Sequence, residues 1–171
     1  ELLDPDLPQD KKIRVGIIGT PNRMRTVRSL LVLLSKFPEM LREIVIINNR
    51  LDIFDDGMRE AFEKAGVPLR VEDRLQRELP HLDVVYINAI AWIGDTYESL
   101  TGDLQLNASS PLKPGSIILH PLARGEELSP SLDATPHNWY FAQARGAVFL
   151  RMALLTCLTQ RANLVMDVEA P

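Results

Sequence analysis

Five short apolar runs, each separated from the next by turn residues or by a stretch with helical spacing, constrain the fold of this 171-residue chain most strongly. They are too short for helices. Their composition is typical of parallel strands, which are buried on both faces and therefore lack a polar side. Strands alternating with helices predict an α/β fold with one parallel sheet covered on both faces. The predicted strands span residues 14–19, 44–47, 69–71, 84–87 and 117–119.

The segments between these runs predict the helices. Residues 24–37 carry apolar side chains at helical spacing, and Asp55 or Asp56 can cap a helix that runs to Lys64, with Gly66 as its stop signal. A short helix is expected at residues 75–79. Residues 88–116 show no strong period, and a loop of that length inside a compact domain is usually functional or mobile.

The last predicted helix, at about residues 146–160, is apolar almost all round. A helix without a polar face is normally buried on every side. Two interpretations follow: it is the central helix of this chain's own core, or one of its faces belongs to a partner domain that this chain does not contain.

Length and composition favour a single globular domain, because 171 residues with 46% hydrophobic content can bury one core. The net charge of −4 argues against nucleic acid as a partner. There is no run of 18 apolar residues, so we expect no membrane span. The single cysteine, Cys157, cannot form an internal disulfide, which favours a reducing compartment and a cytoplasmic location. No leader with a charged start and an apolar core opens the chain.

We expect the chain to be organised in three segments. Residues 1–12 hold two prolines and six charged side chains, which predicts a linker or frayed end. Residues 13–165 form the domain, and residues 166–171 form a tail. The first residue is Glu1 rather than Met, and we expect it to mark a cut near an interdomain linker.

Ligands of parallel α/β sheets bind at the carboxyl ends of the strands. After the first strand, Arg23, Arg25 and Arg28 cluster at a helix start, where cations are locally unfavourable. Either an anionic ligand explains them or they are solvated surface residues. A dinucleotide-binding module is disfavoured, because neither G-x-G-x-x-G nor a phosphate-binding G-K-[ST] is present.

Two further segments follow strand ends. Residues 88–94 are poor in charge, and Trp92 either packs or lines a pocket. After the fifth strand, His120 and Pro121 lead into Leu122 and Ala123, whose backbone groups could face a small ligand. Arg124 could donate a forked pair of hydrogen bonds to a carboxylate or a phosphate.

The stretch from residue 120 to residue 155 resembles the C-terminal signature of aspartate carbamoyltransferases, in which H-P-L-P-R-x-x-E-I is followed by Y-F-x-Q-A and R-x-A-L-L. Upstream, Arg25, Thr26 and Ser29 resemble the family's G-R-T-x-x-S segment, and the resemblance covers roughly residues 12–165. Proline after the histidine favours the aspartate branch over the ornithine branch. The matching residues are His120, Pro121, Leu122, Arg124, Glu127, Asp133, Pro136, Tyr140, Phe141, Gln143, Ala144, Arg151, Ala153, Leu154 and Leu155.

The resemblance implies the C-terminal, amino-acid-binding domain of an aspartate/ornithine carbamoyltransferase. It implies a three-layer α/β/α sandwich, Rossmann-like or flavodoxin-like. The full-length parent protein would be a homotrimer that acts in pyrimidine biosynthesis and needs neither a metal nor an organic cofactor. The substrates would be an amino acid and carbamoyl phosphate, the latter bound by an N-terminal domain. Arg25 would bind a substrate carboxylate, and Leu122 and Ala123 would offer backbone groups. His120, Arg124 and Arg151 would support the loop and the domain contact.

Departures from the family's pattern put the substrate in doubt. Where aspartate enzymes carry T-R-x-Q after the fourth strand, this chain has Ala89 at the arginine position and Ala91 at the glutamine position. Losing a forked arginine removes a substrate contact outright. The alternative function is therefore a degenerate, non-catalytic homologue with a structural or assembly role. In either case we expect this chain alone to be inactive, and we expect Arg25 and Arg124 to open onto one cleft.

Overall fold

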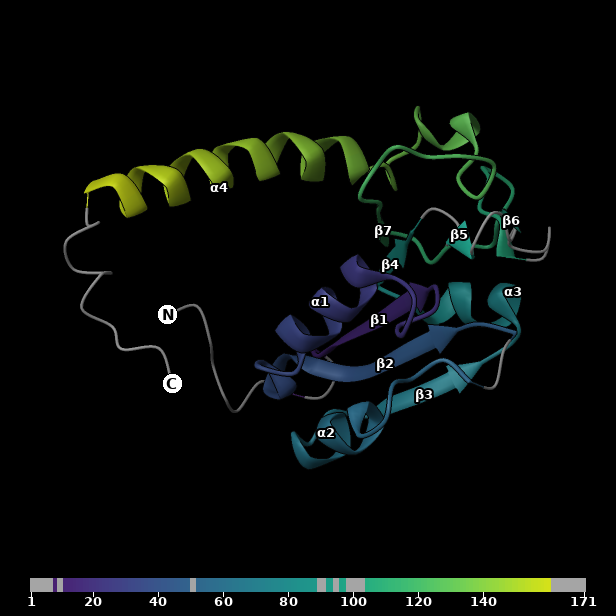
Figure 1. Cartoon of the computed structure of the whole chain (residues 1–171). Helices are drawn as coiled ribbons and strands as arrows, with labels where there is room; N and C mark the ends of the chain where they lie inside the picture. Colours follow the sequence, from purple (N-terminus) through teal and green to yellow (C-terminus); the bar gives the residue numbers. More distant parts are fainter. Residues whose placement is uncertain are drawn as a thin grey trace.

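A five-stranded parallel sheet forms the centre of the protein (Figure 1). The computed structural model describes residues 8, 11–49, 52–88, 92–93, 96–97 and 104–160. The strand order is β3-β2-β1-β4-β7, and every pairing in this sheet is parallel. The five predicted strands are confirmed as β1 (Ile13–Ile18), β2 (Leu41–Ile47), β3 (Leu69–Glu72), β4 (Val84–Ile87) and β7 (Ile117–Leu119).

Helices cover both faces of the sheet, which confirms the three-layer α/β/α arrangement (Figure 1). Successive strand residues point to opposite faces. On one face, Ile17 and Ile44 share a buried cluster with residues of α1 (Arg25–Leu34) and α2 (Met58–Lys64). On the other face, Val45 and Val85 share a second cluster with α3 (Leu75–Glu78), η2 (Leu79–His81), η4 (Pro130–Leu132) and the start of α4 (Tyr140–Gln160).

The predicted boundaries of α1 and α2 differ from those observed. Helix α1 ends at Leu34 rather than near residue 37, and Pro38 instead opens the 3-10 helix η1 (Pro38–Met40). The expected cap of α2 by Asp55 or Asp56 is wrong. The capping residue is Gly57 at φ 74°, and no side chain caps the helix. The stop at Gly66 is confirmed, because its φ of 71° is left-handed and suits glycine.

The segment that showed no period carries a small element of its own. Strands β5 (Trp92–Ile93) and β6 (Thr96–Tyr97) form an antiparallel pair, with Trp92 opposite Tyr97. Strands of two residues are too short to produce a periodic pattern, so neither strand was predicted.

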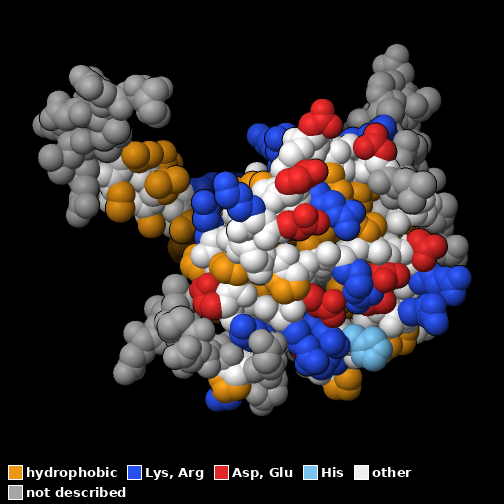
Figure 2. Space-filling view, turned by 90° about the horizontal axis from the view of Figure 1, so that it is seen from below, with side chains coloured by type: hydrophobic (Ala, Val, Ile, Leu, Met, Phe, Trp, Pro, Cys, Tyr) orange, Lys and Arg blue, Asp and Glu red, His pale blue; other side chains and the backbone are white. Residues whose placement is uncertain are grey.

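Helix α4 (Tyr140–Gln160) starts six residues earlier than predicted and projects from the sheet as an arm (Figure 1). Gly146 suggested a boundary, yet glycine inside a helix costs only about 1 kcal/mol relative to alanine. Tyr140 is fully buried, whereas Phe149 is 60% and Leu150 is 73% exposed. Figure 2 shows apolar side chains along this arm. The interpretation of α4 as a central core helix is therefore wrong, because Tyr140 at its start is the only buried residue among those described in this helix.

Helix α4 also meets a length and composition criterion for crossing a bilayer. An 18-residue window has a mean hydropathy of 1.3, and none of that window is buried. A single helix of this kind is weak evidence, because the core helix of a water-soluble protein passes the same test. The expected linker and the expected tail fall almost entirely outside the described residues, so the domain limits at residues 13 and 165 stay predictions.

Candidate functional site

Loops that follow β1, β4 and β7 lie at the same edge of the sheet, because parallel strands end together. These loops contain the three segments that the sequence singled out. In the β4 loop only Asn88 is described before β5, so Ala89 and Ala91 lie outside the described residues, as does the side chain of Trp92.

The loop after β1 is fixed by a buried asparagine at the end of β2. The Asn48 side-chain N–H donates to the Gly19 carbonyl at 2.9 Å and to Oγ1 of Thr20 at 2.8 Å. The Thr20 carbonyl in turn accepts from the backbone N–H groups of Arg23 and Met24, at 3.0 and 2.9 Å. These bonds fix the backbone at the first turn of α1. Asn48 therefore determines the position from which the Arg25 side chain extends.

The three arginines at the start of α1 have different environments. Arg28 forms a 3.0 Å ion pair with Asp55, and both side chains are well exposed. Such pairs contribute about 0–1 kcal/mol, and this one explains Arg28 without a ligand. Arg23 and Arg25 are exposed and have no side-chain hydrogen bond or ion pair within the described part of the chain. Both interpretations, anion binding and solvation, therefore stay open for these two.

A second asparagine joins the loop of β4 to α1. The Asn88 side-chain N–H donates to Oγ1 of Thr26 at 2.7 Å, across 62 positions of sequence. Asn48 and Asn88 were both missed by the sequence reasoning. Each follows a predicted strand directly, so polar residues at strand ends were the signal that could have found them.

A buried histidine–glutamate pair shapes the loop after β7. His120 and Glu127 are 0% and 1% exposed, and Nε2 of His120 lies 2.9 Å from Oε1 of Glu127. The Leu122 backbone N–H donates to Nδ1 of His120 at 2.9 Å. Because Nδ1 accepts this bond, the ring proton must reside on Nε2, which donates it to Glu127. The two hydrogen bonds thus select one tautomer of His120.

Hydrogen bonds keep Glu127 ionised despite its burial. Burial alone would raise the pKa of this carboxyl group, but the bonds from His120 and from the Gly125 backbone N–H outweigh it, so the pKa is lowered. Oε1 of Glu127 therefore ties both ends of the loop 120–127 together. Within it, Leu122 has a left-handed φ of 53°, and the Leu122–Ala123 peptide bond is cis.

Arg124 donates its forked hydrogen bonds to Asp133 of the same chain. One guanidinium nitrogen lies 2.8 Å from Oδ2 of Asp133, and the other contacts Oδ1. The Tyr140 hydroxyl also donates to Oδ1. The guanidinium lies 5.8 and 5.7 Å from the ring centroids of Tyr140 and Phe141. The fork is thus engaged internally, which agrees with a supporting role, and the direct contact of Arg124 with a ligand stays a prediction.

These contacts shift two pKa values. Hydrogen bonds from Arg124 and then from Tyr140 lower the pKa of Asp133 to about 2. Burial and the bond to Asp133 raise the pKa of Tyr140 to about 12. At neutral pH Arg124 is therefore a cation, Asp133 an anion and the Tyr140 hydroxyl neutral. Their hydrogen bonds hold the loop against the start of α4.

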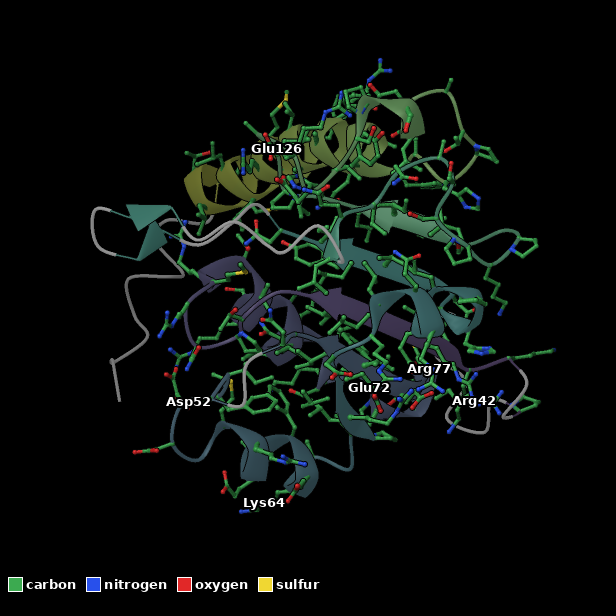
Figure 3. The ribbon with its side chains drawn as sticks, turned by 90° about the vertical axis from the view of Figure 1, so that its right-hand side faces the viewer. Arg42, Asp52, Lys64, Glu72, Arg77 and Glu126 are labelled. Carbon is green, nitrogen blue, oxygen red and sulfur yellow. The ribbon has the colours of Figure 1, made fainter. Side chains whose placement is uncertain are left out.

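The structure brings some predicted site residues together and separates others. Leu122 is half-buried and Ala123 exposed, and Gln143 of α4 accepts the His120 backbone N–H at 2.9 Å. Figure 3 labels Glu126, which belongs to this loop and lies on the α4 side of the molecule.

The structure shows fewer contacts for the other predicted site residues. Arg151 is exposed on α4, with no partner among the residues described. Strand β4 separates the β1 loop from the β7 loop, and a cleft shared by Arg25 and Arg124 stays a prediction. Within the described residues no group of His, Cys, Asp and Glu could hold a metal ion.

Comparison with known proteins identifies the family. Residues 11–158 match the model of the "Aspartate/ornithine carbamoyltransferase, Asp/Orn binding domain". The chain is 36% identical over 156 residues to the aspartate carbamoyltransferase catalytic subunit of Methanocorpusculum labreanum, covering 85% of this chain and 49% of the relative. It is also 36% identical over 158 residues to that of Alkaliphilus oremlandii, covering 85% and 46%. The chain thus spans about half the length of these relatives.

A solved structure gives the same result. Aspartate transcarbamoylase from Trypanosoma cruzi, in complex with carbamoyl aspartate and phosphate, superposes with a TM-score of 0.72 at 26% identity. The match covers 85% of this chain and 48% of that one. Sequence and fold agree, and the chain belongs to the aspartate/ornithine carbamoyltransferase family, in which it corresponds to the Asp/Orn binding domain.

Proposed function

We propose that this chain is the amino-acid-binding half of an enzyme that transfers a carbamoyl group from carbamoyl phosphate to an amino group. The observation that carries the proposal is the loop 120–127. The buried His120–Glu127 pair and the Arg124–Asp133 fork hold the backbone of Leu122 and Ala123 in one conformation. A loop fixed in advance suits a reaction that depends on positioning, because ordering the reactants supplies much of the rate.

Each half of the active site has its own task in this proposal. Arg25 binds a carboxylate of the amino-acid substrate, and carbonyl groups of the loop orient its amine. The unprotonated amine attacks the carbonyl carbon of carbamoyl phosphate and a tetrahedral oxyanion forms. The carbon–oxygen bond to phosphate then breaks, and the departing phosphate takes up the proton that the amine nitrogen loses. Stabilising that oxyanion requires preorganised donors, and we assign them, with the phosphate site, to the N-terminal half.

The exposed apolar surface of α4 supports the proposal that a second domain of the full-length protein covers it. Phe149, Leu150, Leu154 and Leu155 are 58–73% exposed, although burying one such side chain is worth about 1.5–3 kcal/mol. We assign this surface to the carbamoyl-phosphate domain of a homotrimeric, cytoplasmic parent rather than to a membrane. The relatives of about twice this length support the assignment.

The second candidate is a non-catalytic homologue, and specific residues favour it. Ala89 and Ala91 occupy positions where aspartate enzymes carry an arginine and a glutamine, and Ala123 stands where the family's loop has proline. If the enzyme is active, these changes favour an amine less polar than aspartate, because the forked carboxylate contact is gone.

Assaying the full-length parent with carbamoyl phosphate and a panel of amines separates the candidates. An enzyme releases phosphate with at least one amine, and Arg25→Gln raises the KM for that amine by roughly tenfold to a hundredfold, since it removes one charged contact. Arg59→Gln, on the outer surface of α2, is the control and leaves KM unchanged. Absence of turnover with every amine, in a folded parent, supports the non-catalytic candidate. Turnover by this 171-residue chain alone contradicts the division of labour proposed above.

A further inference from the structure

We propose that a hollow at the amino-terminal edge of the sheet binds a phosphate group. The hollow has a volume of about 120 Å³ and does not involve the candidate site, which lies at the carboxyl edge. Its charged lining comprises Lys11, Lys12, Arg14, Arg42, Asp83 and Lys113.

Sheet topology explains why these residues meet. Lys11 and Lys12 precede β1, Arg42 is the second residue of β2, and Lys113 lies four residues before β7. Strand register aligns these starts, since Ile13 pairs with Leu41 and Val84 pairs with Ile117. The hollow is thus built from segments far apart in sequence. Figure 3 shows Arg42, at the start of β2, and Asp52, five residues after the end of β2, at opposite ends of the sheet.

The acidic groups near the hollow are already paired. Asp83 accepts the Arg14 backbone N–H at 2.8 Å and contacts the ammonium group of Lys113. The Arg14 side chain lies 2.9 Å from Oε1 of Glu43. The desolvation that would raise the pKa of Asp83 is outweighed by its bonds to Arg14 and Lys113, so the pKa is lowered and the group is ionised at neutral pH.

Three cations at the hollow are left without an anion. Lys11, Lys12 and Arg42 have no side-chain hydrogen bond or ion pair in the part of the chain that is described. The whole chain carries a net charge of −4, so this concentration of positive charge is local. His81 also lines the hollow.

The size and donor set of the hollow suit a phosphate group. One water needs roughly 10–15 Å³ of such space, so about 120 Å³ admits a larger guest. Cations from the starts of two strands approach it from different segments, and a tetrahedral oxyanion can accept hydrogen bonds in several directions at once. Lysines bind phosphate as point charges, whereas Arg42 can donate a fork.

The test follows backbone amide NMR shifts of this chain during titration with inorganic phosphate and, in parallel, with glycerol phosphate at constant low ionic strength. We expect saturable shifts at Ile13, Arg42 and Asp83, which weaken as salt is added because the cations are partly exposed. If inorganic phosphate and glycerol phosphate bind with equal affinity, a free phosphate ion is a sufficient ligand. If glycerol phosphate binds more tightly, the ligand is the phosphate group of a larger molecule.

Variants tie the shifts to the hollow. Lys12→Gln with Arg42→Gln weakens binding about tenfold, which corresponds to 1.4 kcal/mol. The charge-matched control, Arg59→Gln with Lys64→Gln on α2, keeps the original affinity, and so does Arg25→Gln at the candidate site. The proposal is overturned by absence of saturable shifts, by shifts centred on Arg25, or by equal weakening in the control. Absence of saturable shifts, or equal weakening in the control, leaves the carbamoyl-transfer proposal unaffected, whereas shifts centred on Arg25 place the anion at the candidate site instead.

Discussion

Oε1 of Glu127 lies 2.9 Å from Nε2 of His120, and both side chains are excluded from solvent. Glu127→Ala leaves the His120 ring N–H and the Gly125 backbone N–H without their acceptor. Each buried unsatisfied group costs about 1–3 kcal/mol, so we expect the free energy of unfolding to fall by roughly 2–4 kcal/mol. Urea denaturation measures this change. The unfolding free energy of Glu126→Ala, at the exposed neighbouring position, should stay within about 0.5 kcal/mol of that of the unmodified chain. Equal losses in the two variants would contradict the role of the pair.

Acid stability depends on the fork between Arg124 and Asp133. The folded pKa of Asp133 is about 2, below the value near 3.8 expected in the unfolded chain. The stabilisation from this ionised carboxylate is therefore complete above about pH 4 and is lost as the pH falls toward 2. Subtracting the unfolding free energies of Asp133→Asn from those of the unmodified chain at each pH should give a difference that shrinks across this window. Asp56→Asn, at an exposed position, is the control, and a flat difference for Asp133→Asn would refute the coupling.

Two glycines should respond to alanine with opposite signs. A Cβ at Gly16 would lie 2.3 Å from Cδ1 of the buried Leu82, and overpacking of this kind costs about 1–3 kcal/mol. A Cβ at Gly146, inside α4, would meet nothing within 4 Å, and removing a helical glycine stabilises by about 0.5–1 kcal/mol. Thermal unfolding of Gly16→Ala and Gly146→Ala compares them. Adding Leu82→Ala to Gly16→Ala should show a coupling energy, because the two positions touch.

The exposed arm of α4 gives a prediction that separates this chain from its parent. Leu150 is 73% exposed, so Leu150→Gln should change the unfolding free energy of this chain by less than about 0.5 kcal/mol. In the full-length parent, where the proposal buries this side chain, the same change should cost about 1.5–3 kcal/mol. Denaturation of both proteins checks the difference. Equal effects in the two would remove α4 from the domain contact.

Local patterns were sufficient for most of the sheet. All five strands were predicted because a parallel strand buried on both faces reads as a continuous apolar run, wherever its partners lie. The stop at Gly66 was also predicted, since a left-handed turn depends on one residue. The cap of α2 was not, because Asp55, Asp56 and Gly57 all suit that position and only the path of the chain chooses among them.

The sequence by itself determined the strands, their alternation with helices and the family resemblance, since these depend on residue type and spacing along the chain. Only the tertiary structure decided the partner of Arg124, the tautomer of His120 and the anchoring role of Asn48. It also decided that the apolar α4 is exposed. These properties depend on contacts between segments far apart in sequence, and an apolar helix has the same composition whether its cover belongs to its own chain or to another domain.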